Sequence, residues 1–220
     1  MMKDIQAVIF DLDGTLIYTL DDLTDSINYT MIKYGYPVYT VAQIQTFVGN
    51  GLEKLTECAL TCRPKNFDEI FDCFKKHYSK HCNDKTRLYD GVKDMLLEVK
   101  KRYKIAIVTN KNELALEALR KIYFDGIVEV VVGQSENLRK KPAPDGVYLA
   151  LDKLGVKNEN AVYVGDSEVD VETAVNSGLP MIACLWGFRT KKLLQNSGAK
   201  IFAKKPMDII KILGNELENE

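Results

Sequence analysis

Two pairs of aspartates stand directly after apolar runs, where their carboxylates could act together. Asp11 and Asp13 end the first apolar run, and Asp166 and Asp170 follow a later one. Residues two apart in an extended chain point to the same side, so Asp11 and Asp13 are expected on one face. Carboxylates gathered in one place repel one another, and they would suit a hard cation such as Mg²⁺.

A hydroxyl, an amide and an ammonium group follow two other apolar runs. Thr109 and Asn110 end one run, and Lys141 lies in the loop after another. A divalent cation together with a lysine and hydrogen-bond donors would suit a phosphoryl group. Each residue taken alone could be an ordinary loop, cap or surface residue. Four such places, each after a predicted strand, favour a shared chemical role.

The apolar runs also predict the elements that must bring these residues together. Strands buried on both faces are predicted at 5–10, 105–108, 127–132, 161–164, 181–185 and 200–203. Helices are predicted at about 112–122, from the loop after Pro144 to 154, from Asp166 to 177, at 190–197 and from 206. This alternation predicts an α/β fold, a Rossmann-like doubly wound parallel sheet whose ligands bind at the carboxyl ends of the strands.

The chain from about 20 to 82 interrupts this alternation after the first strand. Apolar residues recur there at helical spacing, near 20–31, 52–59 and 67–81, and no strand is predicted. The sequence therefore predicts an α/β core over 1–17 and 85–220, with an all-helical domain inserted over 18–84.

Composition excludes several classes of protein. The 220 residues include 30 Lys and Arg against 31 Asp and Glu, which gives no basic excess for nucleic acid. No apolar run approaches the roughly 18–20 residues that span a bilayer, so no membrane segment is expected. Five cysteines without a signal segment are typical of reduced thiols in a cytoplasmic protein. A monomer and a homodimer are both compatible with the sequence.

The motifs together resemble those of the haloacid dehalogenase (HAD) superfamily, in its phosphatase branch. Residues 10–16 are similar to the nucleophile motif of that family, and 164–170 to its acidic motif. Residues 109–111 and 141–142 resemble the two motifs between them. The resemblance covers nearly the whole chain, including a helical cap after the first motif. Within the superfamily the chain is most similar to phosphoglycolate phosphatases.

The resemblance implies a role for each residue. Asp11 would be the nucleophile that forms an aspartyl-phosphate, and Asp13 would be the general acid and base. Thr109 and the backbone N–H of Asn110 would bind phosphoryl oxygens. Lys141 would add a positive charge that also steadies Asp11.

The resemblance also implies Mg²⁺ as the cofactor. The Asp11 carboxylate, the Asp13 backbone carbonyl and Asp166 would bind it, and Asp170 would act either as a further ligand or through a neighbouring group. Glu168 is expected to be peripheral, because the family's acids occupy the other two positions of this motif.

The helical domain is expected to select the substrate, and its loop Gly49-Asn50-Gly51 to contact it. Acids and bases are nearly balanced in this domain, so a small phosphate monoester fits best, with phosphoglycolate as the leading candidate by resemblance. Sugar phosphates, nucleotides and pyrophosphate stay open. Lys141 is favoured over Lys140 because the family lysine directly precedes proline.

A sugar-phosphate mutase similar to beta-phosphoglucomutase is the main alternative. Such mutases carry a Glu-Asp pair in the acidic motif and an arginine in the cap loop, whereas this chain has Gly165-Asp166-Ser167 and no arginine near residues 49–51. Dehalogenases lack the Asp13-type acid. Phosphonate hydrolases need a Schiff-base lysine in the cap, for which Lys33 and Lys54 are candidates by location only.

A structural zinc site in the helical domain is a hypothesis of another class. Cysteines and histidines recur there at helical spacing, and the candidate ligands are Cys58, Cys62, Cys73, His77, His81 and Cys82. No CxxC pair is present, so buried thiols and solvated histidines are the simpler interpretation.

Overall fold

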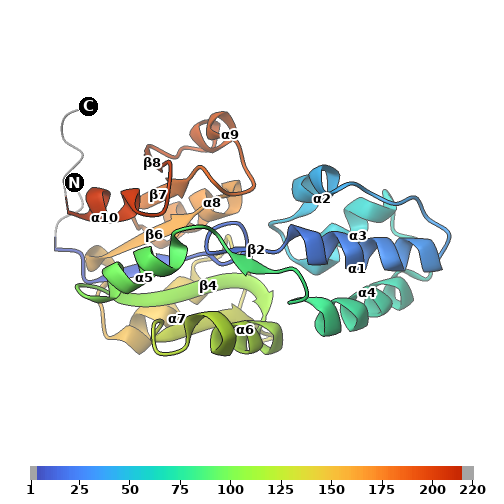
Figure 1. Ribbon diagram of the computed structural model, residues 1–220, viewed down its shortest axis with the longest axis horizontal. Helices are drawn as coiled ribbons and strands as arrows, with labels where there is room; N and C mark the ends of the chain where they lie inside the picture. Colours follow the sequence, from blue (N-terminus) through green and yellow to red (C-terminus); the bar gives the residue numbers. More distant parts are fainter. Residues whose placement is uncertain (1–3, 215–220) are drawn as a thin grey trace. The chain divides into compact units, whose positions relative to one another are not determined.

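The computed structural model describes residues 4–214, apart from the side chains of residues 112 and 114 (Figure 1). The chain divides into two compact units. One is the helical unit Tyr18–Arg87, and the other, the α/β unit, combines the chain before it with the chain from Leu88 onward. No helix among the described residues combines the length and the apolar character that a bilayer span needs.

A six-stranded parallel sheet forms the centre of the α/β unit, in the order β5-β4-β1-β6-β7-β8. The strands are β1 (Ala7–Phe10), β4 (Lys104–Asn112), β5 (Val130–Gln134), β6 (Ala161–Gly165), β7 (Met181–Cys184) and β8 (Ile201–Ala203). Because β1 lies between β4 and β6, the chain after Phe10 emerges between the ends of those two strands. This order brings three of the predicted motifs to one edge of the sheet.

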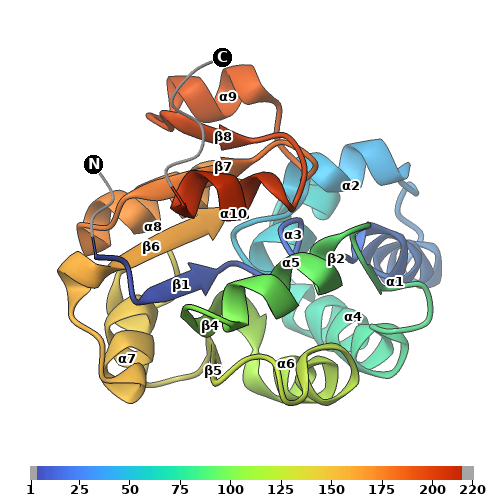
Figure 2. The same cartoon turned by 60° about the vertical axis from the view of Figure 1, so that its left-hand side comes forward.

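Helices cover both faces of this sheet, which confirms the predicted doubly wound α/β fold (Figure 2). On one face, α5 (Val92–Lys100), α6 (Glu113–Leu119) and α10 (Asp208–Leu213) pack on the even-numbered residues of β1. On the other, α7 (Asp145–Leu154) and α8 (Glu168–Ser177) pack on its odd-numbered residues. A smaller cluster joins α8 to α9 (Lys191–Asn196). All four residues of β1 are fully buried, as the continuous apolar run predicted.

Helices build the core of the second unit. They are α1 (Leu20–Lys33), α2 (Val41–Phe47), α3 (Leu52–Leu60) and α4 (Phe67–His81). Their apolar faces share one hydrophobic cluster, which includes Ile27, Phe74 and Tyr78. The bounds of α4 coincide with the predicted helix over 67–81, whereas α2 was not predicted.

Two short strands mark the passages of the chain between the units. They are β2 (Ile17–Tyr18) and β3 (Arg87–Leu88), which pair with each other. Just before β3, the Asp22 carboxylate on α1 accepts hydrogen bonds from Lys85 N at 2.9 Å and from Thr86 N and Thr86 Oγ1, both at 2.8 Å. These bonds attach residues 85 and 86 to the helical unit, so the division follows Arg87 and not residue 84.

Two predicted elements differ from the observed ones. The strand predicted at 127–132 is β5, Val130–Gln134, because the N–H groups of Ile127 and Val128 donate to Phe124 O in a turn. The helix predicted at 112–122 is α6 followed by a π-helical turn, Arg120–Phe124. The run expected to end at 108 continues as β4, with a shift in its register between Val108 and Asn112.

Candidate functional site

Asp11 follows the last residue of β1 and is 6% exposed. Its N–H donates to Val164 O of β6 at 2.8 Å, which continues the sheet pairing by one residue. Its Oδ1 accepts from Lys141 Nζ at 2.6 Å, and its Oδ2 accepts from Thr15 Oγ1 at 3.3 Å. The carboxylate is therefore held on both oxygens at the carboxyl end of the central strand.

The chain turns sharply after Asp11. Leu12 O accepts from the N–H groups of the three residues at 15–17, and Gly14 takes a φ of 95°. A Cβ on Gly14 would lie 2.5 Å from Asp166 Oδ2, so only glycine fits there without movement. The turn thus places Thr15 against Asp166, whose Oδ1 accepts from Thr15 Oγ1 at 3.0 Å.

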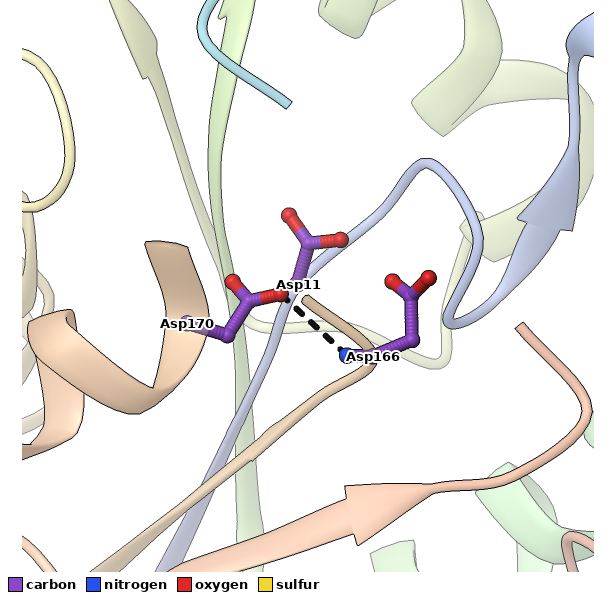
Figure 3. Close-up of side chains that lie close together, drawn as sticks. All are labelled: Asp11, Asp166 and Asp170. Atoms are coloured by element: carbon purple, nitrogen blue, oxygen red, sulfur yellow. Dashed lines mark hydrogen bonds between the residues drawn. The ribbon is translucent and has the colours of Figure 1, made fainter. Parts of the chain in front are cut away.

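Three acidic side chains meet beyond the strand ends (Figure 3). Asp11, Asp166 and Asp170 are all buried, and one carboxylate oxygen of each lies within 4.8 Å of the others. Among the residues described, no other group of three or more acidic, histidine or cysteine side chains lies this close together. All-oxygen ligands of this kind suit a hard divalent cation.

Glycines pack closely around these acids. A Cβ on Gly187 would lie 2.5 Å from Asp166 Oδ2, and one on Gly165 would lie 2.5 Å from Asp170 Cγ. The N–H of Phe188 donates to Asp166 Oδ2 at 2.7 Å. The positions of both acids are therefore fixed by the backbone, which fits a metal site built in advance.

Asp170 is held more extensively than the other two acids. Its Oδ2 accepts from Ser167 Oγ at 2.6 Å, and also from the N–H groups of Ser167 and Asp166. Its Oδ1 accepts from Lys141 Nζ at 2.7 Å and from Tyr163 Oη at 3.1 Å. Ser167 and Asp170 also form the capping box of α8, so the residue that caps this helix is Ser167 and not Asp166.

Lys141 connects the acids. Its buried Nζ donates to Asp11, Asp170 and Tyr163, and an ammonium group has three protons for three such acceptors. The Asn110 side chain holds the backbone of Lys141, because Asn110 Oδ1 accepts from Lys141 N at 2.8 Å and Asn110 Nδ2 donates to Lys141 O at 3.1 Å. Lys140, by contrast, is exposed.

The irregular part of β4 carries Thr109, Asn110 and Lys111. Register shifts next to active sites commonly redirect side chains. Here Lys111 N donates to Thr109 Oγ1 at 3.2 Å, and Lys111 Nζ donates to Asp13 Oδ1 at 2.9 Å. These contacts connect Asp13, in the turn after β1, with the irregular segment of β4 that carries Thr109.

Burial and mutual repulsion set the ionisation of this group. Burial and the neighbouring Asp170 raise the pKa of Asp11 to about 7. Burial and the other two acids raise the pKa of Asp166 well above its ordinary value. Burial also raises that of Asp170, but the Lys141 ammonium and the Ser167 hydrogen bonds outweigh it, and this pKa is lowered. The two carboxyls with raised pKa values are those that a cation would stabilise in the charged form.

The remaining predicted residues lie in other elements of the chain. Gly49, Asn50 and Gly51 lie in the helical unit, between α2 and α3. Glu168 binds Arg189 through two contacts, Nε to Oε2 at 2.7 Å and a second guanidinium nitrogen to Oε1 at 3.1 Å. This ion pair accounts for Glu168 without a role in the acidic cluster.

Within residues 4–214, the cysteines and histidines proposed as zinc ligands do not form a group of three close enough to hold one ion. His77 Nδ1 lies 3.0 Å from Ser26 Oγ, and His81 Nδ1 lies 2.7 Å from Asp84 Oδ2. Cys73 Sγ accepts from Lys33 Nζ at 3.5 Å, and all five cysteines are free.

Lys111, Tyr163 and Gly187 were not among the predicted site residues. Lys111 stood inside a motif that the sequence singled out, so its position was an available signal. Tyr163 looked like one more apolar residue of a buried strand, and its hydroxyl contacts depend on the folded neighbours. Gly187 follows β7 and has no local pattern that indicates contact with Asp166.

Comparisons with known proteins agree with this geometry. The family model of haloacid dehalogenase-like hydrolases matches residues 8–184. A phosphoglycolate phosphatase of Aquifex aeolicus is 30% identical, with 96% of this chain and 98% of the relative covered. One from Xanthomonas campestris is 33% identical over 86% of each chain.

A solved structure from Lactobacillus delbrueckii, of a protein predicted to be a phosphoglycolate phosphatase, is similar throughout. Its TM-score is 0.92 at 31% identity, with 96% of this chain and 98% of that chain covered. A motif set, a fold and a buried acidic cluster all agree with the match to the family model. The chain belongs to the haloacid dehalogenase-like hydrolase family.

Proposed function

We propose that this protein is a Mg²⁺-dependent phosphatase that hydrolyses a small phosphate monoester, with phosphoglycolate as the leading substrate. The observation that carries the proposal is the buried group of Asp11, Asp166, Asp170 and Lys141 at the end of the central strand. The names of the relatives support the substrate class.

In the first step, an Asp11 oxygen attacks phosphorus and the bond from phosphorus to the ester oxygen breaks. The carboxyl group of Asp13 gives its proton to the leaving oxygen, which departs as an alcohol. Thr109 Oγ and the Asn110 N–H donate to the phosphoryl oxygens, and Lys141 lowers the repulsion between Asp11 and the phosphate.

In the second step, water attacks the phosphorus of the aspartyl-phosphate. The Asp13 carboxylate takes a proton from this water, and the bond from phosphorus to Asp11 breaks. Phosphate leaves, and both aspartates return to their starting forms. The same residue acts as acid and then as base, so the cycle needs no other proton carrier.

The residues that would hold Mg²⁺ are the carboxylates of Asp11 and Asp166 and the backbone carbonyl of Asp13. When bound, the cation supplies positive charge that offsets the charge on the phosphoryl oxygens. Asp170 supports the site through Lys141, Tyr163 and Ser167, because the Lys141 ammonium and the Ser167 hydrogen bonds already stabilise its charged form and lower its pKa, whereas the pKa values of Asp11 and Asp166 are raised.

We assign substrate selection to the helical unit, with the loop at Gly49–Gly51 as the part that contacts the substrate. The expected cytoplasmic location and the oligomeric state, a monomer or a homodimer, stay predictions. The alternatives are a sugar-phosphate mutase and a phosphatase for sugar phosphates, nucleotides or pyrophosphate. The substrate screen below distinguishes them.

The test is a screen of purified protein against phosphoglycolate, glucose phosphates, nucleoside monophosphates, pyrophosphate and simple alkyl phosphates, with released phosphate as the readout. We expect phosphate release that stops in excess EDTA and returns when Mg²⁺ is added. Undiminished turnover in EDTA would contradict the metal assignment. Conversion of one glucose phosphate into its isomer, without net phosphate release, would favour the mutase.

A further inference from the structure

Lys111 is a second buried lysine of the site, with a partner of its own. Its Nζ donates to Asp13 Oδ1 at 2.9 Å, and the two side chains are 5% and 17% exposed. A lysine is rarely this buried unless it is paired. The contact joins residues 98 apart in the sequence, from β4 to the turn after β1.

Each of the two buried lysines contacts a different aspartate of the first motif. Lys141 Nζ contacts Asp11, Asp170 and Tyr163. Asp13 lies only two residues beyond Asp11, but its carboxylate is held by Lys111, which comes from a different part of the chain. The nucleophile and the acid/base are therefore oriented by separate cations.

We propose that Lys111 is a positioning residue for Asp13, fixing its carboxylate in the orientation from which it exchanges protons with the ester oxygen and with water. This inference rests on the proposed phosphatase function. Proton transfer requires the carboxyl group within hydrogen-bond reach of the reacting oxygen. An aspartate side chain rotates about two bonds, and the contact with Lys111 restricts both rotations.

The architecture of β4 makes Lys111 suited to this task. The register shift between Val108 and Asn112 sends Thr109, Asn110 and Lys111 out of the regular ladder. Asn110 then holds the backbone of Lys141, while Lys111 holds Asp13. One irregular segment thus contacts both the lysine that binds Asp11 and the carboxylate of Asp13.

The experiment compares Lys111→Met with wild type on ethyl phosphate, phosphoglycolate and 4-nitrophenyl phosphate. We expect kcat for the two alkyl esters to fall about 10²-fold, as for a displaced catalytic group, with KM nearly unchanged. Nitrophenolate is a weak base that hardly needs a proton, so its first step is spared. A burst of nitrophenol near one per active site should follow, because hydrolysis of the phosphoenzyme is slow.

A double-mutant cycle shows whether Lys111 acts through Asp13. In an Asp13→Asn background, Lys111→Met is expected to lower kcat further by less than about threefold, because the group it positions is already inactive. Lys111→Arg keeps the charge and is expected to recover part of kcat. The matched control is Lys153→Met, an exposed lysine of α7, which should behave as wild type.

Several results would overturn the inference. Losses that multiply fully in the double mutant would show that Lys111 acts independently of Asp13. A rise in KM for phosphoglycolate but not for ethyl phosphate, at unchanged kcat, would assign Lys111 to the substrate carboxylate. Unchanged kcat on all three esters would leave the ion pair a structural one.

The controls distinguish failure of the proposed function from failure of the inference about Lys111. If wild type hydrolyses no ester, the proposed function fails and the inference falls with it. If wild type is active and Asp13→Asn shows the dependence on leaving group, only the Lys111 results decide. Should circular dichroism show that Lys111→Met does not fold, Lys111→Gln provides the same loss of charge, and Lys111→Arg stays the variant that keeps it.

Discussion

The two units bury charge in opposite ways. Within residues 4–214, the buried charged side chains lie in the α/β unit, with the exception of Asp22 in the helical unit. Asp22 accepts only from the backbone and the hydroxyl of residues 85 and 86, and these donors satisfy it. In the α/β unit, three carboxylates instead lie against one another, and two of them have raised pKa values.

This difference separates a structural buried charge from a functional one. A carboxylate surrounded by N–H and O–H donors is stabilised in its charged form and contributes to folding. Carboxylates packed against like charges lower the stability of the metal-free protein. Such destabilising clusters are typical of functional sites. Substitution of one residue of each kind should therefore have opposite consequences.

Asp11→Asn is expected to have the largest effect on activity. The amide fills the same space but cannot attack phosphorus, so kcat should fall by at least about 10³-fold. Because the change removes a charge from a repelling group, the midpoint of thermal unfolding without metal should stay the same or rise. Turnover is measured by phosphate release, and unfolding by circular dichroism.

The control for deamidation of the new asparagine is mass spectrometry of the assayed sample. A variant that keeps more than a few per cent of turnover as a verified amide would remove Asp11 from its assigned role. A large drop in its unfolding midpoint would break the comparison between the units, because Asp11 would then resemble Asp22.

Asp22→Ala is expected to show the reverse pattern. The change leaves the N–H groups of Lys85 and Thr86 without their acceptor, which should lower the free energy of unfolding by about 2–3 kcal/mol. At a temperature where the variant is folded, kcat should stay within about twofold of wild type. Chemical denaturation and the phosphate assay measure the two quantities.

A matched control is Asp25→Ala. Asp25 forms an exposed ion pair with Lys85 at 2.6 Å, and such surface pairs contribute little, so its loss should cost less than about 1 kcal/mol. Equal destabilisation by both variants would argue against a special structural role for Asp22.

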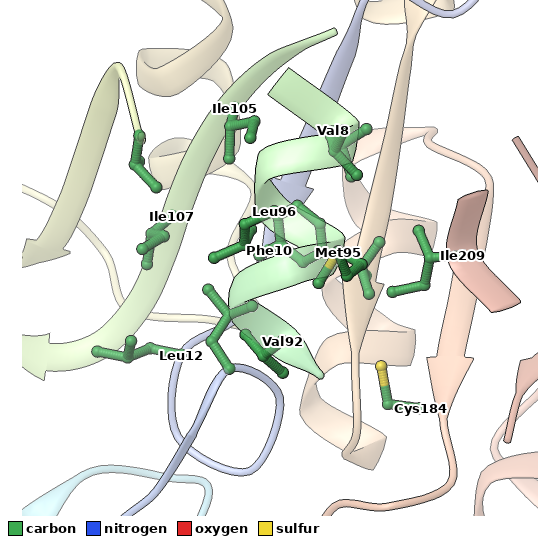
Figure 4. Packing of buried hydrophobic residues seen from close by; sticks show 14 of the residues in the cluster. Val8, Phe10, Leu12, Val92, Met95, Leu96, Ile105, Ile107, Cys184 and Ile209 are labelled. Carbon is green, nitrogen blue, oxygen red and sulfur yellow. The ribbon is translucent and has the colours of Figure 1, made fainter. Parts of the chain in front are cut away.

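The same contrast explains how much of the molecule could be predicted from the sequence. Patterns along the chain predicted the parallel sheet, the helical insert and the full extent of α4, because buried faces leave a periodic trace. Helix α5 was missed, although Val92, Met95 and Leu96 pack against the strands in the finished core (Figure 4). Helix α2 was missed too, although Thr40 and Gln43 form a capping box that was visible in the sequence.

The candidate site was predicted as far as residue types at strand ends allow. The placement of β1 between β4 and β6 is a property of the sheet order, and it brings Thr109 and Asp166 to either side of Asp11. The contacts of Lys111 and Tyr163 depend on a register shift and on cross-strand neighbours. Neither feature leaves a local pattern, so neither could be derived from spacing alone.

The smallest effect, taken per pH unit, is expected in the dependence of Mg²⁺ affinity on pH. The raised pKa of Asp11, about 7, means that the folded metal-free protein carries a proton there through weakly acidic pH, and Asp166 shifts in the same direction. Mg²⁺ must displace such protons, so its affinity should rise with pH, and displacement of the Asp11 proton alone should contribute about tenfold per pH unit up to about pH 7.

Stability without metal should change with the opposite sign. A carboxyl whose folded pKa is raised binds more protons in the folded than in the unfolded state, so its contribution to the free energy of unfolding falls as pH rises from about 4 to 7. Saturating Mg²⁺ should reduce this fall.

Trp186 donates its indole N–H to Thr15 O at 3.0 Å, and it is the single tryptophan of the chain, so its fluorescence offers a direct titration of Mg²⁺ binding at the site. Asp11→Asn provides the comparison, since it removes one of the displaced protons and should flatten the pH dependence of the remaining affinity. An affinity for Mg²⁺ that is constant between pH 5 and 8 would show that these carboxyls are already ionised, and that the α/β unit satisfies its buried charges as completely as the helical unit satisfies Asp22.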